Sequence, residues 1–368
     1  MGDVLEQFGH GGDLVTAAEK SGLDPTQILD FSANINPQGP PPSVMEVIEL
    51  RSIVHYPDPD QRNFRSALAA QLGIGMDKLL IGNGAAECMA LAMLAFAPQR
   101  VGVVYPCFSE YTQLAEQFEA TEIRGVYGRE ELGFQPDLKE LGQLIHWADL
   151  VFIGHPNNPT GTVYCLAELK ALAEQAAQDE TYLIIDEAFL DFLPESEQET
   201  LLDQLDRYPT TVIIRSLTKM YAIPGLRLGY AVAASELIVR MKGKQVTWSV
   251  NTLALAAGKH CLAEQTYVAR TRSLVGEQRE RLKTEIKQRL GWQIWSGRAN
   301  FLLVRLPAPL TALELQTWLL ERGILIRNCA MYPGLGAGDF RIAVLDQDKN
   351  ERLLAALSDF QAQRGEKE

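Results

Sequence analysis

The stretch SLTKMYAIPGLRLGY, residues 216–230, says more about this chain than any other. It follows an apolar run, TVIIR, and it carries the hydroxyl groups of Ser216 and Thr218 and the guanidinium of Arg227. Groups of these kinds can bind a phosphate dianion together. A lone lysine in a polar loop is usually a solvated charge, but Lys219 stands beside this phosphate clamp. Its amine can condense with the aldehyde of a phosphorylated cofactor, so the stretch predicts a cofactor-binding lysine.

Asp186 ends a second apolar run, YLIID, and is followed by EAFLDF. A carboxylate directly after a buried strand points into the crevice at the strand ends. There it can keep a pyridinium nitrogen protonated and the ring electron-withdrawing. A helix cap or a surface acid explains the string DEAF equally well when it is taken alone.

Two turn motifs complete the set. HPNNPTG (155–161) follows LVFIG; its prolines fix the backbone, Gly161 allows a tight turn, and Asn158 is left to donate to an oxygen. GNGAAE (82–87) follows LLI and opens an apolar helix whose first N–H groups can seat a phosphate. Plain Asn-Pro turns and glycine-rich helix starts are common, so each motif is weak by itself. The four motifs together, in this order, predict one site at the ends of neighbouring strands.

From about residue 79 onward, short apolar runs alternate with longer amphipathic ones, which predicts an α/β fold. The runs are rich in Val, Ile and Leu with little polar alternation, as in strands buried on both faces of a mostly parallel sheet. Helices are expected between them, for example over 87–97 and 166–178. The expected strands are Leu79–Ile81, Val101–Val104, Leu150–Ile153, Tyr182–Ile185, Val212–Ile214 and Leu228–Val232.

After about residue 235 the alternation of short apolar runs with amphipathic runs gives way to a different pattern. Helices are expected over Thr266–Leu290 and Ala312–Arg322, with strands in the runs around them, so this part predicts a smaller α+β domain. The beginning of the chain is rich in Gly, Pro and Asn and is expected to form an arm. We therefore expect an arm that joins the small domain (1–45), a large domain (46–240) and a small C-terminal domain (241–368).

The overall charge favours a small ligand over a polyanion. Asp and Glu outnumber Lys and Arg by 47 to 34 in 368 residues, so nucleic acid is not an expected partner. A few local arginines can still bind a small anion. The five cysteines form no CxxC pair and the histidines show no metal-ligand spacing, so we expect neither a disulfide framework nor a metal site. Without a signal-peptide pattern or a membrane-spanning apolar run, a cytoplasmic protein is expected.

The order and wording of these motifs resemble the fold type I pyridoxal-phosphate enzymes, the aspartate aminotransferase superfamily. Within it the chain is most similar to the branch that holds histidinol-phosphate aminotransferases and L-threonine-O-3-phosphate decarboxylases. The resemblance runs from HGGD at residue 10 to DFRIAV, which ends at residue 344. It implies pyridoxal 5'-phosphate as the cofactor and a homodimer as the active unit.

The resemblance also implies roles for single residues. Lys219 would form the Schiff base, Asp186 would pair with the pyridine nitrogen, and Asn158 would bond the ring hydroxyl. Phe108 would stack on the ring, and Tyr56 would reach the cofactor phosphate of the neighbouring subunit. The cofactor phosphate would be held by Ser216, Arg227 and the amides of Ala85 and Ala86.

For the substrate, the resemblance implies that Arg341 binds a carboxylate. The phosphate or carboxylate of the substrate would also be addressed by Arg327, His10, the Gly11–Gly12 backbone and Asn34. Asn158 would contact the substrate as well as the cofactor. A turn histidine and surface salt bridges are the plain alternatives for His10 and for the two arginines. Phe8 departs from the family pattern, in which a small polar residue can stand two places before the histidine.

Several strings favour a decarboxylase, and so does Phe189, where the related aminotransferases usually carry a tyrosine that bonds the ring oxygen. The expected reaction is decarboxylation of L-threonine O-3-phosphate to (R)-1-aminopropan-2-yl phosphate, a step of cobalamin biosynthesis. Histidinol-phosphate aminotransfer is the alternative on the same scaffold. A regulator that keeps the fold without catalysis is the alternative from another class. Use of serine phosphate as a second substrate stays open, because one methyl group is worth only about 1–3 kcal/mol in a pocket.

Overall fold

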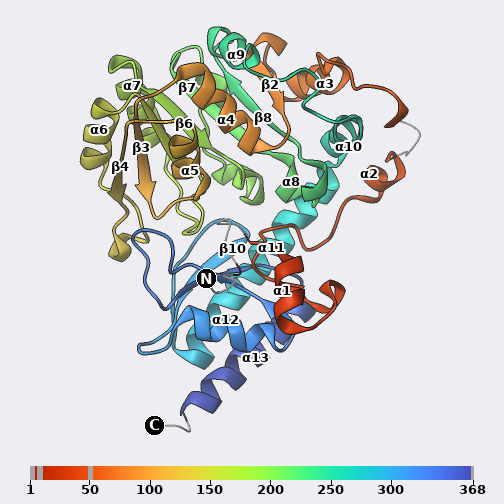
Figure 1. The fold of residues 1–368 in the computed structure, drawn as a ribbon, viewed down its shortest axis with the longest axis vertical. Coiled ribbons are helices and arrows are strands. Elements are labelled where there is room, and N and C mark those ends of the chain that lie inside the picture. The colour runs from red at the N-terminus through yellow and green to blue at the C-terminus, as the bar shows by residue number, and fades with distance from the viewer. Residues whose placement is uncertain (1–4, 6–10, 49–52, 366–368) are drawn as a thin grey trace.

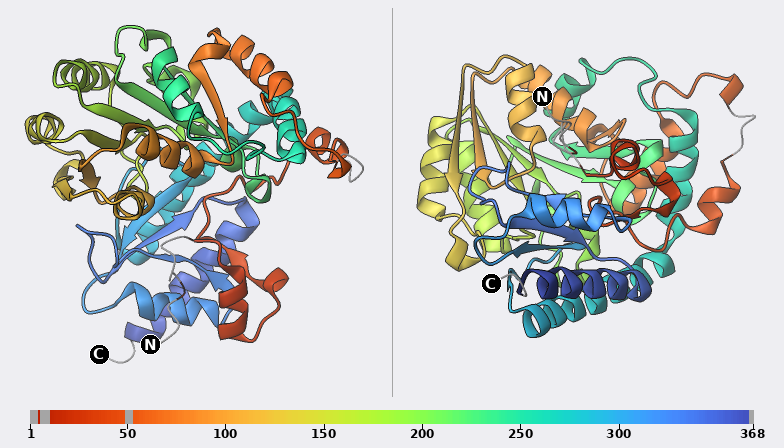
Figure 2. Two further views of the ribbon diagram at one scale, coloured as in Figure 1. Left: turned by 45° about the horizontal axis from the view of Figure 1, so that its top comes forward. Right: turned by 60° about the horizontal axis from the view of Figure 1, so that its bottom comes forward.

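The computed structural model describes Leu5 and residues 11–48 and 53–365. Its upper part in Figure 1 holds a large sheet with helices on both faces, and its lower part holds a smaller sheet. Helix α11 (Gln265–Glu285) runs from the upper part into the lower one. Figure 2 shows the same two parts from two further directions.

Within the described ranges, the large sheet has seven strands in the order β2-β8-β7-β6-β5-β3-β4. Strand β8 is antiparallel to β7 and β2, and the other neighbours are parallel. The predicted mostly parallel α/β sheet is therefore confirmed, and each of the six expected strands overlaps an observed one. The strands are β2 (Leu79–Gly82), β3 (Arg100–Tyr105), β4 (Glu122–Tyr127), β5 (Leu150–Gly154), β6 (Tyr182–Asp186), β7 (Thr211–Ser216) and β8 (Gly229–Ala233).

Both faces of this sheet are buried, and successive residues of a strand enter different cores. Leu150 and Phe152 of β5 pack with α4, α5 and α9, whereas Val151 and Ile153 pack with α6 and α7. The two cores explain why these strands read as unbroken apolar runs. The helices around the sheet are α3 (Arg62–Leu72), α4 (Ala85–Phe96), α5 (Glu110–Gln117), α6 (Leu138–Trp147), α7 (Leu166–Gln178) and α9 (Ser235–Lys242).

Strand β4 was not expected from the sequence. It forms the edge of the sheet and pairs only with β3 among the described strands. Its side chains alternate between exposed and half-buried, so its run EIRGVY lacks the continuous apolar character of the inner strands. An edge strand of this kind gives a weak sequence signal because one of its sides faces water.

The smaller sheet lies in the C-terminal part and has, in the described residues, the order β12-β13-β10-β9. The beginning of the chain lies beside it, because β1 (Leu29–Asp30) pairs in parallel with β11 (Ile324–Leu325). The remaining strands are β9 (Gln293–Ile294), β10 (Phe301–Arg305), β12 (Arg327–Asn328) and β13 (Asp339–Ala343). The remaining helices are α1 (Leu14–Ser21), α2 (Pro42–Glu46), α8 (Leu217–Met220), α10 (Thr252–Ala263), α12 (Ala312–Leu320) and α13 (Gln347–Gly365).

The expected helix over Thr266–Leu290 is present as α11, which is continued by a π-helical turn over Ile286–Leu290. Helix α10 packs on α3 and α2, so the chain stays beside the large sheet for some distance past residue 240. The division of the chain at residues 45 and 240 stays a prediction.

One edge of the large sheet collects the ends of several strands. The carboxyl ends of β5, β6 and β7 meet there because these strands are parallel. Strand β2 shares their direction, since it is antiparallel to β8, which is itself antiparallel to β7. Strand β8 runs the opposite way, so its beginning lies at this same edge. The stretch before β8, which contains Arg227, is thereby brought to the ends of the parallel strands.

Candidate active site

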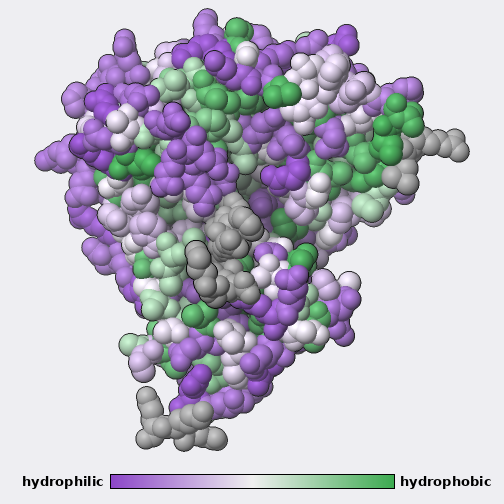
Figure 3. Space-filling model, viewed as in Figure 1, coloured by the Kyte–Doolittle hydropathy of each residue, from purple (hydrophilic) through white to green (hydrophobic). Residues whose placement is uncertain are grey.

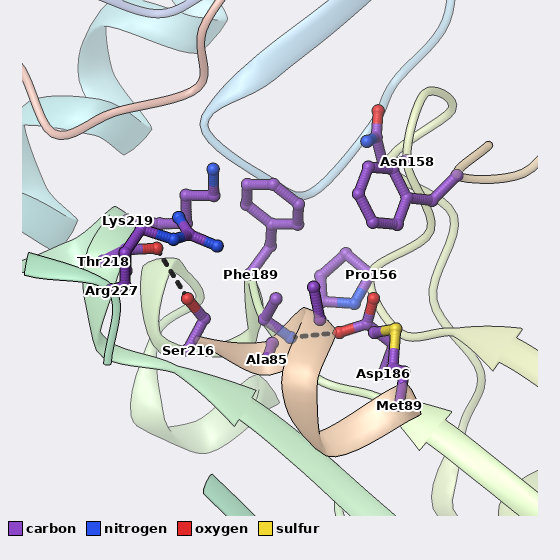
Figure 4. A pocket seen from close by; sticks show the side chains of 13 residues that line it. Ala85, Met89, Pro156, Asn158, Asp186, Phe189, Ser216, Thr218, Lys219 and Arg227 are labelled. Atoms are coloured by element: carbon purple, nitrogen blue, oxygen red, sulfur yellow. Dashed lines mark hydrogen bonds between the residues drawn. The ribbon is translucent and has the colours of Figure 1, made fainter. Parts of the chain in front are cut away.

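The four sequence motifs meet in one cavity at this edge of the sheet. Its internal volume is about 610 Å³, part of which is open to solvent. Figure 4 shows Lys219, Thr218 and Arg227 on one side of the cavity, and Asp186 and Asn158 on the other. The lining residues are Ala85, Ala86, Met89, Phe108, Pro156, Asn158, Asp186, Ala188, Phe189, Ser216, Thr218, Lys219 and Arg227.

Strand alternation decides which residues face this cavity. Ile184 of β6 and Ile214 of β7 belong to the core on the α4 and α5 side. Asp186 and Ser216 lie two residues further along these strands and therefore point to the same side. Both residues end their strands, so their side chains emerge at the rim of the sheet. The motif spacing alone thus carries the carboxylate and the hydroxyl into one crevice.

One end of the cavity is built to bind a phosphate. The hydroxyl groups of Ser216 and Thr218 are buried and lie 2.7 Å apart. Helix α4 begins at Ala85, so its first backbone N–H groups face this end without partners inside the helix. The guanidinium of Arg227 lies against Gly84, where an added Cβ would be 2.7 Å from its Nη2 atom. Hydroxyls, helix N–H groups and a guanidinium form a dianion site together.

Burial changes the charge balance of Lys219. Desolvation, together with the nearby positive charges of Arg341 and Arg227, lowers the pKa of Lys219 to about 8, while Asp186 acts in the opposite direction. About one amine in ten is therefore neutral at pH 7, against fewer than one in a thousand at the ordinary pKa of lysine. A neutral amine is the nucleophilic form that condensation with a carbonyl group requires.

Asp186 is shifted in the other direction. Burial raises the pKa of this carboxyl to about 6, although hydrogen bonds from Tyr111 and the Ala188 N–H and the charge of Lys219 lower it. The carboxylate accepts from the Tyr111 hydroxyl at 2.8 Å and from the Ala188 N–H at 3.0 Å. At neutral pH it is an ionised group held rigidly at the cavity wall.

The C-terminal part contributes an arginine to the same site. Arg341 lies in β13 and is buried, and its Nη1 donates to the Oδ1 of Asn158. Its Nη2 donates to the carbonyl oxygen of Ser32 at 2.5 Å. The N-terminal segment also contacts helix α8, which carries Lys219, because the Asn36 N–H donates to the Lys219 carbonyl at 3.1 Å. Segments far apart in the sequence thus close the cavity from outside the large sheet.

One other residue predicted to bind the substrate neighbours Arg341, and two more lie in the N-terminal segment. Arg327 is buried and opposes Arg341 in the β12–β13 ladder. Asn34 is 4% exposed, and its Oδ1 has no hydrogen-bond partner among the described residues. Gly11 lies so close to Ser32 that an added Cβ would be 2.2 Å from the Ser32 carbonyl oxygen. His10 and Phe8 lie outside the described residues.

Tyr56 is the predicted cofactor residue that does not reach this cavity. It is 80% exposed and stacks on Trp248, with ring centroids 4.6 Å apart. The two side chains line a surface groove together with Ile53, Val54 and Leu253. The predicted role of Tyr56 in a neighbouring subunit stays a prediction.

Tyr111 was missed by the sequence reasoning. It lies on α5, three residues after Phe108, and its hydroxyl reaches Asp186 from behind the cavity wall. Nothing in the string YPCFSEY distinguishes this tyrosine from an ordinary core aromatic. Its position at helical spacing from a ring-stacking candidate was the available signal.

No group of three or more His, Cys, Asp or Glu side chains in the described part of the chain is placed to hold a metal ion. None of the described helices is long and apolar enough to span a bilayer.

Comparison with known proteins identifies the class to which this fold and cavity belong. Residues 26–357 match the family described as aminotransferase class I and II. The chain belongs to this family. Its architecture, with a mostly parallel sheet and an α/β order of elements, is that of the fold type I pyridoxal-phosphate enzymes, as the resemblance implied.

Within the family, the chain is similar to proteins with two different activities. The threonine-phosphate decarboxylase of Salmonella typhimurium is 39% identical over 357 residues, which cover 96% of this chain and 97% of the relative. The crystal structure of L-threonine-O-3-phosphate decarboxylase from Porphyromonas gingivalis superposes with a TM-score of 0.80 at 25% identity, covering 90% of this chain and 98% of that one. Histidinol-phosphate aminotransferase from Clostridium acetobutylicum gives a TM-score of 0.85 at 29% identity, covering 91% and 100%.

Proposed function

We propose that this chain is a pyridoxal-phosphate-dependent decarboxylase that converts L-threonine O-3-phosphate to (R)-1-aminopropan-2-yl phosphate and carbon dioxide. The observation that carries the proposal is the meeting of Lys219, Asp186 and the phosphate clamp in one cavity, next to which Arg341 bonds the lining residue Asn158. The full-length similarity to threonine-phosphate decarboxylase supports the choice of substrate. The product would supply the aminopropanol linker of cobalamin.

The cavity fits pyridoxal 5'-phosphate. Its lining combines apolar walls with a few convergent polar groups, as is usual in cofactor sites. Ser216, Thr218, Arg227 and the amides of Ala85 and Ala86 would hold the phosphate, and Asp186 would face the ring nitrogen. Asn158 would bond the ring hydroxyl and Phe108 would lie against the ring. When bound, the cofactor supplies an aldehyde for the amines and a ring that withdraws electrons from the bond that breaks.

Lys219 would serve first as the attachment point and later as a proton donor. Its lowered pKa of about 8 leaves the amine able to accept and release protons near neutral pH. After carbon dioxide leaves, the substrate Cα needs one proton in place of the lost carboxylate. Lys219, once freed by the substrate amine, would deliver that proton.

Two buried arginines, Arg341 and Arg327, would bind the anionic groups of the substrate. Arg341 already donates to Asn158 and Ser32, and its Nε is buried without a hydrogen-bond partner among the described residues. A guanidinium so placed can engage a substrate carboxylate. Asn34 and Arg327, together with Gly11 and His10, would address the substrate phosphate.

Phe189 supports decarboxylation over amino transfer. Its ring is 7% exposed, lines the cavity and packs edge-on against Phe301, with centroids 5.1 Å apart. No hydroxyl at this position can therefore bond the phenolic oxygen of the cofactor. Loss of that donor changes the electronics of the ring, as in the decarboxylase branch that the sequence resembles.

The decisive experiment measures carbon dioxide released from threonine phosphate by the cofactor-loaded protein, with the aminopropanol phosphate product identified by mass spectrometry. Lys219→Ala should abolish release, whereas Lys139→Ala, on the exposed surface of α6, should not. Serine phosphate, run in parallel, measures how much the methyl group contributes. No release, combined with turnover of histidinol phosphate and 2-oxoglutarate, would replace the proposal by aminotransfer.

We further propose a homodimer whose interface includes Tyr56. Hydrophobic surface gathers near α2 at the right-hand edge of the molecule (Figure 3). Ile53 is 62% exposed and Val54 72% exposed, and both line the groove that holds Tyr56 and Trp248. Exposed apolar side chains in a cluster are typical of a protein interface.

A complementation experiment tests this arrangement. Light scattering should give twice the monomer mass of 40.8 kDa. Mixing Lys219→Ala with Tyr56→Ala protein should restore activity that neither variant has alone, because one hybrid site would combine an intact lysine with an intact tyrosine. A monomer, or no recovery after exchange of subunits, would contradict the proposal.

The cytoplasm is the proposed location. The five cysteines form no disulfide among the described residues; Cys165 is exposed, and the other four are buried. Thiols outside disulfides are usual in a reducing compartment.

A further inference from the structure

Tyr111 lies directly behind the cavity wall and contacts the group that would face the cofactor ring. Its side chain is 1% exposed, and its hydroxyl donates to the Oδ2 of Asp186 at 2.8 Å. The ring stacks on Phe152, with centroids 5.0 Å apart and planes at 4°, and meets the edge of Phe108 at 5.7 Å. Aromatic packing on two sides leaves the hydroxyl one position, pointing at the carboxylate.

The second oxygen of Asp186 is fixed as well. Its Oδ1 accepts from the backbone N–H of Ala188 at 3.0 Å. One donor on each oxygen sets the plane of the carboxylate and prevents its rotation about χ2. The backbone is also tied down, because the Asp186 carbonyl accepts from the His155 N–H at 2.8 Å. Asp186 therefore holds its orientation before any ligand arrives.

We propose that Tyr111 is a positioning residue that orients the Asp186 carboxylate and keeps it ionised, so that a proton shared with the cofactor ring stays on the ring nitrogen. This inference rests on the proposed function. Tyr111 touches neither cofactor nor substrate in this arrangement and acts through Asp186.

The hydrogen bond from Tyr111 is one of several influences on the pKa of Asp186. Burial raises the pKa of Asp186 to about 6, and the neighbouring Glu187 raises it too, whereas Tyr111, the Ala188 N–H and Lys219 lower it. A carboxyl with this pKa competes with a pyridine nitrogen for one proton. A hydrogen bond to an ionised group corresponds to about one to two pKa units, which is enough to decide the competition.

A tyrosine suits this task because it remains a donor. Burial and the charge of Asp186 raise the pKa of Tyr111 well above its ordinary value. The phenol therefore stays protonated across the physiological range and always donates to Asp186. A titrating donor would lose this function within the working pH range.

Tyr111→Phe removes the hydroxyl and keeps the ring packing. In the cofactor-free protein, carboxyl NMR of Asp186 should show its pKa raised by about one to two units. In the loaded protein, the ¹⁵N shift of labelled cofactor should move toward the neutral pyridine form, and kcat should fall more than KM changes. Tyr208→Phe, a buried tyrosine without a bond to Asp186, should change none of these.

Two further variants distinguish the proposed role of Tyr111 from a general effect of the substitution on the fold. Replacing Tyr111 by 3-fluorotyrosine keeps the fold and strengthens the donor, so both shifts should reverse in sign. In an Asp186→Asn background, Tyr111→Phe should have no further effect on kcat, since the two residues act as one unit. Unchanged Asp186 titration in both position-111 variants would overturn the inference. If the wild-type protein took up no cofactor, the proposed function would fail, while the Asp186 titration would still test Tyr111.

Discussion

The Nη1 of Arg341 donates a hydrogen bond to the Oδ1 of Asn158, and this contact joins the C-terminal sheet to the loop that follows β5 of the large sheet. The resemblance assigned Arg341 to the substrate, and Asn158 to both the cofactor and the substrate. Their direct contact brings the residue predicted to bind the substrate carboxylate next to the residue predicted to bind the ring hydroxyl. The same arginine also holds the N-terminal segment through Ser32.

Arg341→Lys should lower kcat/KM for threonine phosphate by roughly 10- to 150-fold. A lysine cannot bond Asn158, Ser32 and a carboxylate at once, and a lost hydrogen bond to a charged group costs about 1.5–3 kcal/mol. Steady-state kinetics check this expectation. Arg281→Lys, which alters only an ion pair with Glu351 at the surface, is the matched control and should behave as wild type.

Gly229→Ala should weaken cofactor binding by roughly tenfold or more. A Cβ at this position would lie 2.5 Å from the Ala85 nitrogen, so the start of α4 must move away from β8. Each N–H that loses a phosphate oxygen costs about 1.5 kcal/mol or more. Titration with pyridoxal phosphate, followed by absorbance, measures the loss.

Gly276→Ala is the matched control for Gly229→Ala. Nothing lies within 4 Å of a Cβ added to this residue of α11, and its backbone is helical. The substitution should leave cofactor affinity unchanged and should slightly stabilise the protein, since alanine favours helix. Equal affinity of the Gly229→Ala and Gly276→Ala proteins would show that α4 does not bind the phosphate.

Arg215→Met should destabilise the protein by about 3–5 kcal/mol. Arg215 and Glu187 form a buried ion pair at 2.8 Å on the face of the sheet opposite the cavity. Removal of the arginine leaves a buried carboxylate without its cationic partner, and such a break is costly. Denaturant unfolding followed by circular dichroism measures the loss.

An exposed pair provides the comparison. Arg207 and Glu174 lie on the surface, with side chains 66% and 50% exposed, and Arg207→Met should cost less than about 1 kcal/mol. Similar losses of unfolding free energy in Arg215→Met and Arg207→Met would contradict the expectation that burial makes the Arg215–Glu187 pair costly to break. Arg215 directly precedes Ser216 and Glu187 directly follows Asp186, so the same break should also loosen cofactor binding.

Strand β6 was predicted from the sequence and strand β4 was not, and the burial of the two strands explains the difference. YLIID is apolar because both its faces are buried, so both the strand and the position of Asp186 at its end could be predicted. The run of β4 alternates because one of its sides faces water, and it gave no comparable signal. Asp186, Asn158 and Lys219 were found because short motifs hold them at strand ends.

Contacts between distant segments could not be predicted in this way. The bond from Tyr111 to Asp186 spans 75 residues, and the bond from Arg341 to Asn158 spans 183. Both depend on how α5 and β13 pack against the large sheet, which no local pattern encodes. The resemblance supplied a role for Arg341, but Tyr111 has no motif of its own and was recognised only from its contact.

The last prediction concerns the stability of the cofactor-free protein as a function of pH. Burial raises the pKa of Asp186 from 3.8 to about 6, so the folded state binds this proton more tightly than the unfolded state does. The stability that comes from the bound proton is fully present below about pH 4 and is lost as the pH rises through 6. The difference corresponds to about 3 kcal/mol at neutral pH.

Asp186→Asn should therefore stabilise the cofactor-free protein relative to wild type at pH 8 by about 2.5 kcal/mol more than at pH 4. The amide keeps the acceptor for the Ala188 N–H, and its NH₂ group can donate to the Tyr111 hydroxyl, so no polar group is left unsatisfied. The charge of Asp186 raises the pKa of Lys219, so Asp186→Asn also shifts the titration of Lys219; repeating the comparison with Lys219→Met in both proteins removes that contribution. Denaturant unfolding of both proteins at the two pH values gives the difference. A constant difference would mean that Asp186 ionises normally in the empty cavity, and its charge would then cost nothing before the cofactor binds.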